Sequence, residues 1–284
     1  MVYCQILHKL VLILTVFFDN RKLNVSFWLL IFMKNKVVSQ FHKTCMSKKI
    51  KTEFHQLSSF LNFKEEVWQV CKQLYTLEEA VYYERLSIFK HFVIFRDEDK
   101  AIGFLSFFFD ELTLNTKTTV LIGIGHGGVL PEYRNQQLIP RATSKFALKT
   151  ILQNPFKKYF IWGMATTHLS YRMGLRGVKV QYPALDGNCP TLCKELLDWV
   201  GNKYYKENYS SSSFTAKISF AAIGQSIIPS GREIEDPIVA NFIERVPSAL
   251  APNNKIGAFS ITPIGPNLIF WIKKFIWGKR QKQT

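Results

Sequence analysis

With 284 residues, the chain can bury one hydrophobic core and a small appendage, and its 47% hydrophobic and 20% charged residues exclude an intrinsically disordered protein. The formal net charge of +16 lies mostly at the ends: residues 1–51 carry +8 and residues 268–284 carry +5, leaving only +3 between them. A nucleic-acid surface would be built into the folded body. The distribution therefore argues against nucleic-acid binding and fits peripheral contact of both ends with a membrane surface.

The cysteines predict neither a disulfide framework nor a metal site. There are five, an odd and scattered set, and Cys189 and Cys193 form a single CxxxC pair with no second pair to complete a zinc site. We therefore expect reduced thiols, no metal, and a reducing compartment such as the cytoplasm.

Both ends of the chain leave alternatives open. Residues 10–18 and 27–33 are apolar but shorter than the roughly 20 residues that cross a bilayer. The segment 1–51 is either a membrane-associating leader or sequence that precedes a true start at Met33 or Met46. The aromatic, lysine-bearing tail 267–284 would lie in a membrane interface or dock on the domain as a helix.

Between the ends, the periodicity predicts a mixed α/β domain over residues 52–183. One sheet is flanked by helices, and Thr76 is the expected N-cap of the second helix, in a capping box with Glu79. Residues 184–266 are rich in Gly and Pro and contain no periodic element longer than about ten residues besides 237–246, so we expect an irregular extension packed on the domain. The predicted order is helices 64–75 and 76–86, strands 91–95, 101–109 and 118–129, helix 140–152, strand 159–165, short helix 167–173 and strand 178–182.

The centre of this domain resembles the GNAT (acyl-CoA N-acyltransferase) superfamily. Residues 120–134 read VLIGIGHGGVLPEYR, a long apolar strand that runs into V-x-P-E-Y-R before a helix. The resemblance covers about 90 residues and implies a GNAT-like sheet. It also implies transfer of an acyl group from a thioester donor, either acyl-CoA or an acyl carrier, to an amine.

The resemblance places the donor at the turn after this strand. There, backbone N–H groups at a helix N-terminus would hold a pyrophosphate. The family pattern is Arg or Gln, two residues, Gly, one residue, then Gly or Ala; here Arg134 matches, Gln137 and Ile139 replace the small residues, and Pro140 removes a donor. The donor-binding residues implied are Val129, Leu130, Arg134, Asn135, Gln136, Gln137, Leu138 and Ile139.

The resemblance also suggests catalytic residues. His126 lies near the end of the strand, where a base would face the acceptor, and its glycine neighbours would let a ligand approach the backbone. Its alternative role is a strand histidine bonded to a carbonyl, with the glycines marking a bulge. Glu132 is a second candidate base or a capping residue. Tyr171 is the candidate general acid, or else packs with its hydroxyl hydrogen-bonded nearby.

His168 and Arg172 lie four residues apart on one predicted helix, where they would steer an acidic group or form a solvated surface pair. The resulting hypothesis is an N-acyltransferase acting on a small or lipid-like amine. The rival is a non-catalytic GNAT-like domain that binds a partner or a membrane surface through its ends.

Overall fold

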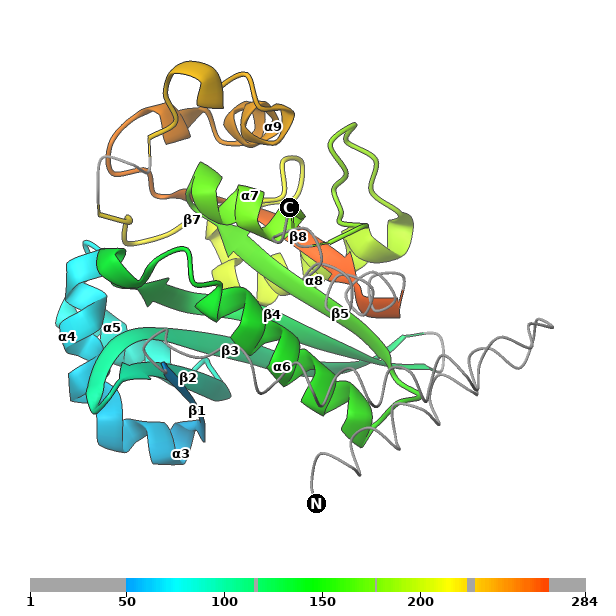
Figure 1. Cartoon of the computed structure of the whole chain (residues 1–284). Helices are drawn as coiled ribbons and strands as arrows, with labels where there is room; N and C mark the ends of the chain where they lie inside the picture. The colour runs from blue at the N-terminus through cyan, green and yellow to red at the C-terminus, as the bar shows by residue number, and fades with distance from the viewer. Residues whose placement is uncertain (1–49, 115–116, 177, 224–227, 266–284) are drawn as a thin grey trace, which may run out of the picture.

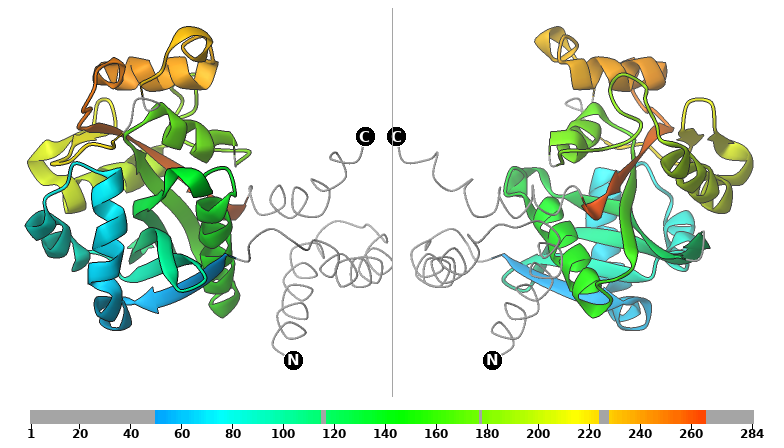
Figure 2. Two further views of the ribbon diagram at one scale, coloured as in Figure 1. Left: turned by 60° about the vertical axis from the view of Figure 1, so that its left-hand side comes forward. Right: turned by 90° about the vertical axis from the view of Figure 1, so that its right-hand side faces the viewer.

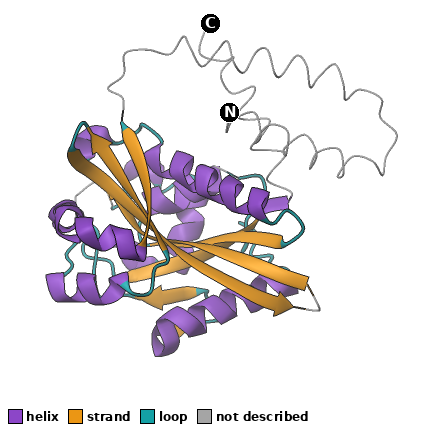
Figure 3. Cartoon of the chain, turned by 90° about the horizontal axis from the view of Figure 1, so that it is seen from below, coloured by secondary structure: helices purple, strands orange, loops and turns teal. Residues whose placement is uncertain are grey.

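The computed structural model describes residues 50–114, 117–176, 178–223 and 228–265. These form one eight-stranded mixed sheet in the order β1-β2-β3-β4-β5-β8-β7-β6, strongly twisted, as Figure 3 shows. Within the described ranges β4 and β5 are the one parallel pair, and the other neighbours run antiparallel. The strands are β1 Lys51–Gln56, β2 His91–Asp97, β3 Lys100–Leu114, β4 Lys117–Val129, β5 Lys158–Ala165, β6 Tyr209–Ser210, β7 Thr215–Lys217 and β8 Ile256–Pro263.

Helices cover both faces of the sheet, which confirms the predicted mixed α/β class (Figure 2). Successive side chains of a strand point to opposite faces. Thus the ring of Phe107 stacks on Phe146 of α6, with 4.4 Å between the ring centroids. The ring of Phe108 points the other way and packs against Trp162 of β5 at 4.8 Å and against Tyr204 of α8 at 4.4 Å. The helices are α3 Leu57–Phe60, α4 Lys64–Leu74, α5 Glu79–Leu86, α6 Leu138–Gln153, α7 His168–Arg176, α8 Thr191–Tyr205 and α9 Pro237–Arg245, with 3-10 turns that include η2 Pro131–Tyr133 and η5 Gly231–Glu233.

The predicted start of the second helix is wrong by three residues. Helix α5 begins at Glu79 after the N-cap Glu78, with no side-chain cap. The Thr76 hydroxyl instead accepts a hydrogen bond from the amide of Ala221 at 2.9 Å, and the amide of Thr76 donates to the Ala221 carbonyl at 2.9 Å. A partner 145 residues away satisfies the threonine, so the local capping rule does not apply.

The region 184–266 is more regular than its composition predicts. It contains the 15-residue helix α8 and helix α9, and β8 pairs along β5 from Phe160↔Pro263 to Ala165↔Ala258. Residues 178–182 do not form the predicted strand, because Tyr182 makes only an isolated bridge to Ile261. The extension therefore completes the sheet beside β5.

The leader 1–49 and the tail from residue 266 lie outside the described residues, so their predicted membrane contact stays a prediction. In the described part of the chain, no helix is both long and apolar enough to span a bilayer.

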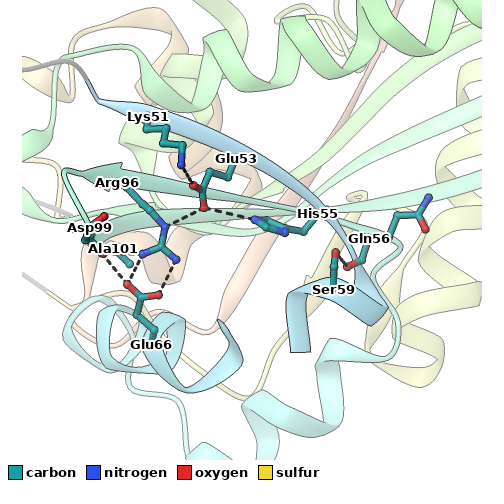
Figure 4. A network of polar contacts seen from close by, with 9 residues as sticks. All are labelled: Lys51, Glu53, His55, Gln56, Ser59, Glu66, Arg96, Asp99 and Ala101. Carbon is teal, nitrogen blue, oxygen red and sulfur yellow. Dashed lines mark hydrogen bonds and ion pairs between the residues drawn. The ribbon is translucent and has the colours of Figure 1, made fainter. Parts of the chain in front are cut away.

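A buried ion-pair network fastens α4 to the edge of the sheet (Figure 4). Arg96 on β2 donates to both carboxylate oxygens of Glu66, at 2.5 and 2.7 Å, and its Nε donates to Glu53 of β1 at 2.9 Å. Glu66 also accepts from the amide of Ala101 at 3.0 Å, and Arg96 donates to the carbonyl of Asp99 at 2.8 Å. One guanidinium thus joins β1, α4 and the β2–β3 turn.

This network predicts acid sensitivity. Hydrogen bonds from Lys51 and Arg96 lower the pKa of Glu53 from 4.5 to about 2. The folded carboxyl therefore stays ionised where the unfolded one takes up a proton. The stabilisation is present above pH 4.5 and should disappear as the pH falls toward 2. Denaturant titrations across this window should show a smaller loss of unfolding free energy for Glu53→Gln than for wild type.

Glu207→Gln is the matched control, because Glu207 is exposed and forms no ion pair with another described residue. If the unfolding free energy of Glu53→Gln fell with pH as steeply as that of wild type, Glu53 would not be the source of the acid sensitivity.

Candidate functional site

The candidate site begins where β4 and β5 separate (Figure 1). Their parallel pairing runs from Thr119↔Lys158 to Ile124↔Gly163 and then ends. On their opposite edges β5 pairs with β8 as far as its end at Ala165, and β4 pairs with β3 as far as Val129. Residues 121–123 are buried, whereas residues 124–129 are half-buried. The second half of β4 therefore has an unpaired edge toward the gap.

Two peptide groups of β4 point into this gap. The amide of Leu130 donates to the Ile102 carbonyl at 2.9 Å, and bonded and non-bonded pairs alternate along an antiparallel ladder. Val129 and Gly127 therefore face away from β3. The Tyr75 hydroxyl donates to the Gly127 carbonyl at 2.5 Å, and Arg134 Nε lies 3.5 Å from the Val129 carbonyl. The two amides remain available to a ligand in the gap.

A β-bulge in β4 sets the direction of His126. The register passes from Leu105↔Gly127 to Phe107↔Ile124, so Ser106 faces two residues of β4. The Ser106 hydroxyl donates to the His126 carbonyl at 3.0 Å. The bulge turns the imidazole toward the face covered by α4 and α5, among aromatic rings.

The glycines of β4 make room for the core, which corrects the expectation that they admit a ligand. A Cβ on Gly125 would lie 2.4 Å from Phe89, and one on Gly128 would lie 2.6 Å from Leu74. Side chains from the layer formed by α4, α5 and the residues that follow them, called the helix layer below, occupy this space. Any ligand must reach the strand from its open edge.

His126 is half-buried against three rings and one cation. Its ring centroid lies 4.5 Å from Phe220, 5.4 Å from Phe89 and 6.3 Å from Tyr75. Burial, with a smaller effect of the Arg85 charge, lowers the pKa of His126 to about 3. The imidazole is therefore neutral at physiological pH. Its Nε2 is enclosed without a hydrogen-bond partner, and Nδ1 is not enclosed in this way.

The predicted donor loop is an exposed turn. Residues 134–137 are exposed, and α6 begins at Leu138. Asn135 and Gln137 adopt positive φ, 67° and 56°, although neither is glycine. The first α6 bond runs from the amide of Arg141 to the Gln137 carbonyl at 3.0 Å. Among the described residues, nothing accepts from the amides of 135–139, so they can donate to a group bound at this exposed turn.

Basic residues are concentrated at this turn and along α6, with Glu132 just before them. Residues 133–153 include four basic residues and no Asp or Glu. Arg134 lies in the turn, while Arg141, Lys145 and Lys149 recur every fourth residue on the exposed side of α6. The positive end of the helix dipole lies at the same place. The turn and helix together favour an anionic ligand.

The structure does not bring the other predicted catalytic residues to His126. Tyr171 is 2% exposed in a separate cluster with Phe242; its hydroxyl donates to Asn241 at 2.7 Å and accepts from Arg245 at 3.1 Å. These contacts are the ones expected for the alternative role of Tyr171, in which the ring packs in the core and the hydroxyl is hydrogen-bonded nearby. Glu132 is exposed on η2.

His168 and Arg172 face the region around α9. His168 is fully buried with Nε2 3.7 Å from Glu233, and Arg172 Nε lies 3.3 Å from Asp236. The solvated surface pair is therefore wrong for His168. Glu233 and Asp236 contact the two side chains, in the place where the predicted anionic group of a donor or acceptor would bind.

Sequence reasoning missed several residues around His126. Tyr75 follows the end of α4, Arg85 lies on α5, and Phe220 comes from the extension. Only the fold brings these distant segments together, so no local motif could have indicated them. The hydrophobic spacing of 64–75 predicted the helix that leads into Tyr75, which itself lies just beyond the helix end.

Comparison with protein-family models finds no match, and comparison with curated proteins finds none either. Among solved structures, the chain is similar to an aminoglycoside acetyltransferase from an uncultured soil metagenomic sample, at 11% identity and a TM-score of 0.33, covering 45% of this chain and 84% of that one.

It is also similar to aminoglycoside N-acetyltransferase AAC(6')-Iy in complex with CoA, at 11% identity, 47% and 88% coverage and a TM-score of 0.32. A third similar structure is a ribosomal-protein-alanine N-acetyltransferase from Brucella melitensis biovar Abortus. Its identity is 9% and its TM-score is 0.34, and the match covers 46% of this chain and 92% of that one. At such low TM-scores and identities, function must be inferred from the geometry of the gap itself.

The environment of His126 predicts an unusual titration. Its folded pKa of about 3 lies below the ordinary 6.5, so between these values the unfolded chain binds a proton that the folded chain does not. Acidification through this window should destabilise the fold, with no effect above pH 6.5. NMR titration of the imidazole Cε1–H should show His126 still neutral at pH 5. A midpoint near 6.5 would contradict the enclosed environment.

Proposed function

We propose that this chain is a GNAT-type N-acyltransferase that moves an acyl group from a phosphorylated thioester donor to an amine. The observation that supports it is the unpaired edge of β4, which leads directly into an exposed turn with outward amides and cations. An extended thioester arm can lie along the edge while its phosphate meets the turn. We infer acyl-CoA or an acyl carrier as donor, because both end in such an arm.

In the proposed reaction the amine nitrogen attacks the thioester carbonyl, a C–N bond forms, and the C–S bond breaks. The electron pair leaves with the sulfur as thiolate, which takes its proton from solvent. The amides of Gly127 and Val129 would donate to the carbonyl oxygen as it gains charge. The Nδ1 of His126 would accept the proton that the amine loses.

The low pKa of His126 has two consequences for this role. The imidazole is always unprotonated at neutral pH, so it is ready to accept a proton. It also holds that proton weakly, because the imidazolium would be enclosed by rings beside Arg85. The acceptor must therefore arrive as a neutral amine, and the rate should rise as the amine deprotonates.

The second candidate function is a non-catalytic domain that binds a partner. The surroundings of the candidate acid support it, since the Tyr171 hydroxyl is bonded to Asn241 and Arg245. Donor binding separates the two functions, because a binding domain has no need for an exposed phosphate-binding turn.

A donor titration tests the proposal. Acyl-CoAs and acyl-carrier thioesters should raise the unfolding free energy by about 2.7 kcal/mol at a hundredfold excess over the dissociation constant. In a coupled thiol-release assay, His126→Gln should lower kcat about a hundredfold and leave donor-induced stabilisation unchanged. Glu132→Gln is the control and should keep kcat within about twofold. Stabilisation by no donor would sink the proposal in favour of the binding domain.

The turn itself offers a gain-of-function test. Gln137 holds a left-handed conformation that costs a non-glycine residue roughly 1 kcal/mol. Gln137→Gly removes this strain and would let a phosphate approach the backbone more closely. Donor affinity, measured by calorimetry, should therefore increase several-fold, with little change in folding stability because glycine also loosens the unfolded chain.

Gln136→Gly is the matched control. Gln136 does not have a positive φ, so the same substitution there only adds chain freedom and should lower stability without improving binding. Equal affinities for the two variants would show that the turn does not contact the donor.

A further inference from the structure

A small cavity lies beside His126. Its volume is about 10 Å³. The site is formed between β3, β4 and the helix layer, and its walls are mostly aromatic. The lining residues are Phe60, Tyr82, Leu86, Phe89, Phe92, Phe104, Ser106 and His126.

Two polar atoms among these residues are enclosed and have no hydrogen-bond partner. They are Nε2 of His126 and the hydroxyl of Tyr82, whose side chain is 2% exposed. A third group, the Ser106 hydroxyl, gives its proton to the His126 carbonyl and keeps lone pairs on Oγ. Buried polar atoms in folded proteins are almost always paired, directly or through ordered water.

We propose that this cavity binds one water molecule that joins His126 Nε2 to the Tyr82 hydroxyl, so that Tyr82 positions the proposed base. A single water needs a cavity of roughly 10–15 Å³ and two to four polar partners. The volume is at the lower end of that range, and the three polar groups supply the partners. The walls exclude any larger ligand.

The surrounding charge excludes a cation as the occupant. On this side His126 has the Tyr75 ring, just past the end of α4, and the Arg85 guanidinium, and Tyr82 of α5 lines the same cavity; both tyrosines are neutral. In the described part of the chain no carboxylate forms an ion pair with Arg85. A positive ion here would meet a like charge without compensation, whereas neutral water meets three hydrogen-bonding groups.

The water would fix the tautomer of His126, an assignment that rests on the proposed function. The base needs an unprotonated Nδ1, because Nε2 is enclosed. The neutral ring must then carry its proton on Nε2 and donate it to the water, while the Tyr82 hydroxyl holds that water in place. The same oxygen stabilises the imidazolium once Nδ1 accepts a proton.

Histidine-labelled full-length protein allows a direct test. In wild type, the ring protons of His126 should show exchange contacts to a long-lived water, and the imidazole ¹⁵N shifts should show the Nε2–H tautomer. Tyr82→Phe removes one oxygen and no ring contact. It should lose the water contact, mix the two tautomers and lower kcat about tenfold or more, with an unchanged donor KM.

Tyr83→Phe is the matched control, since its hydroxyl donates to the exposed Glu65 at 2.6 Å on the outer side of the same helix. It should leave the His126 spectrum and kcat as in wild type. The NMR measurements need no turnover. A water with the Nε2–H tautomer therefore supports the inference even if no thioester binds, an outcome that would overturn the proposed function alone.

Two outcomes overturn the inference. One is a wild-type spectrum without any long-lived water at His126. The other is a tautomer that is Nδ1–H, or that is identical in wild type, Tyr82→Phe and Tyr83→Phe.

Discussion

The separation of β4 from β5 after Ile124 is the constraint on which the candidate site depends. The last parallel pair is Ile124↔Gly163, and β5 ends at Ala165 with its opposite edge paired to β8, while β4 continues along β3 to Val129. The peptide groups of Gly127 and Val129 consequently have no neighbouring strand on this side among the described residues. Such a strand edge presents backbone groups that another extended chain can pair with, which is the feature that the proposed donor would use.

The layer of helices α4 and α5 covers one face of the sheet at this opening and fills the space beside β4 with side chains. Phe89 fills the space above Gly125, Leu74 fills the space above Gly128, and Phe220 covers the imidazole of His126. Close packing here lowers the basicity of the histidine, since the same rings that fill the core also exclude water from Nε2. The site thus combines a closed helix side with an open strand edge, and chemistry is confined to the edge.

Much of the fold could be predicted from the sequence, because its elements are strongly periodic. Helix α4, strands β2, β4 and β5 and helix α6 follow local patterns and were placed within a few residues, whereas β3 runs to Leu114, beyond its predicted end at residue 109. The extension could not be predicted, because β8 is stabilised by pairing with β5 across roughly a hundred residues of sequence.

The candidate site shows the same division. The donor turn follows from a short motif and lies where the resemblance placed it. Tyr75, Tyr82 and Phe220 reach His126 only through tertiary packing, so local sequence carries no sign of them. The glycines around His126 were interpreted as ligand space because their actual neighbours lie on helices far away in the sequence.

The donor turn shows why a motif can look more degraded in letters than it is in structure. The small residues of the pattern serve two purposes, a left-handed backbone and close approach of a phosphate. Gln137 keeps the first purpose, because its φ of 56° turns the chain into α6 with the amides outward. The second purpose is lost, since its side chain and Pro140 reduce the space and the donors at the helix start. Charge compensates at longer range, because Arg134 and Arg141 flank the turn and outnumber the neighbouring Glu132. A donor held by such a turn would depend more on charge and less on close amide contacts, and its affinity would fall more steeply with salt than where glycines line the loop.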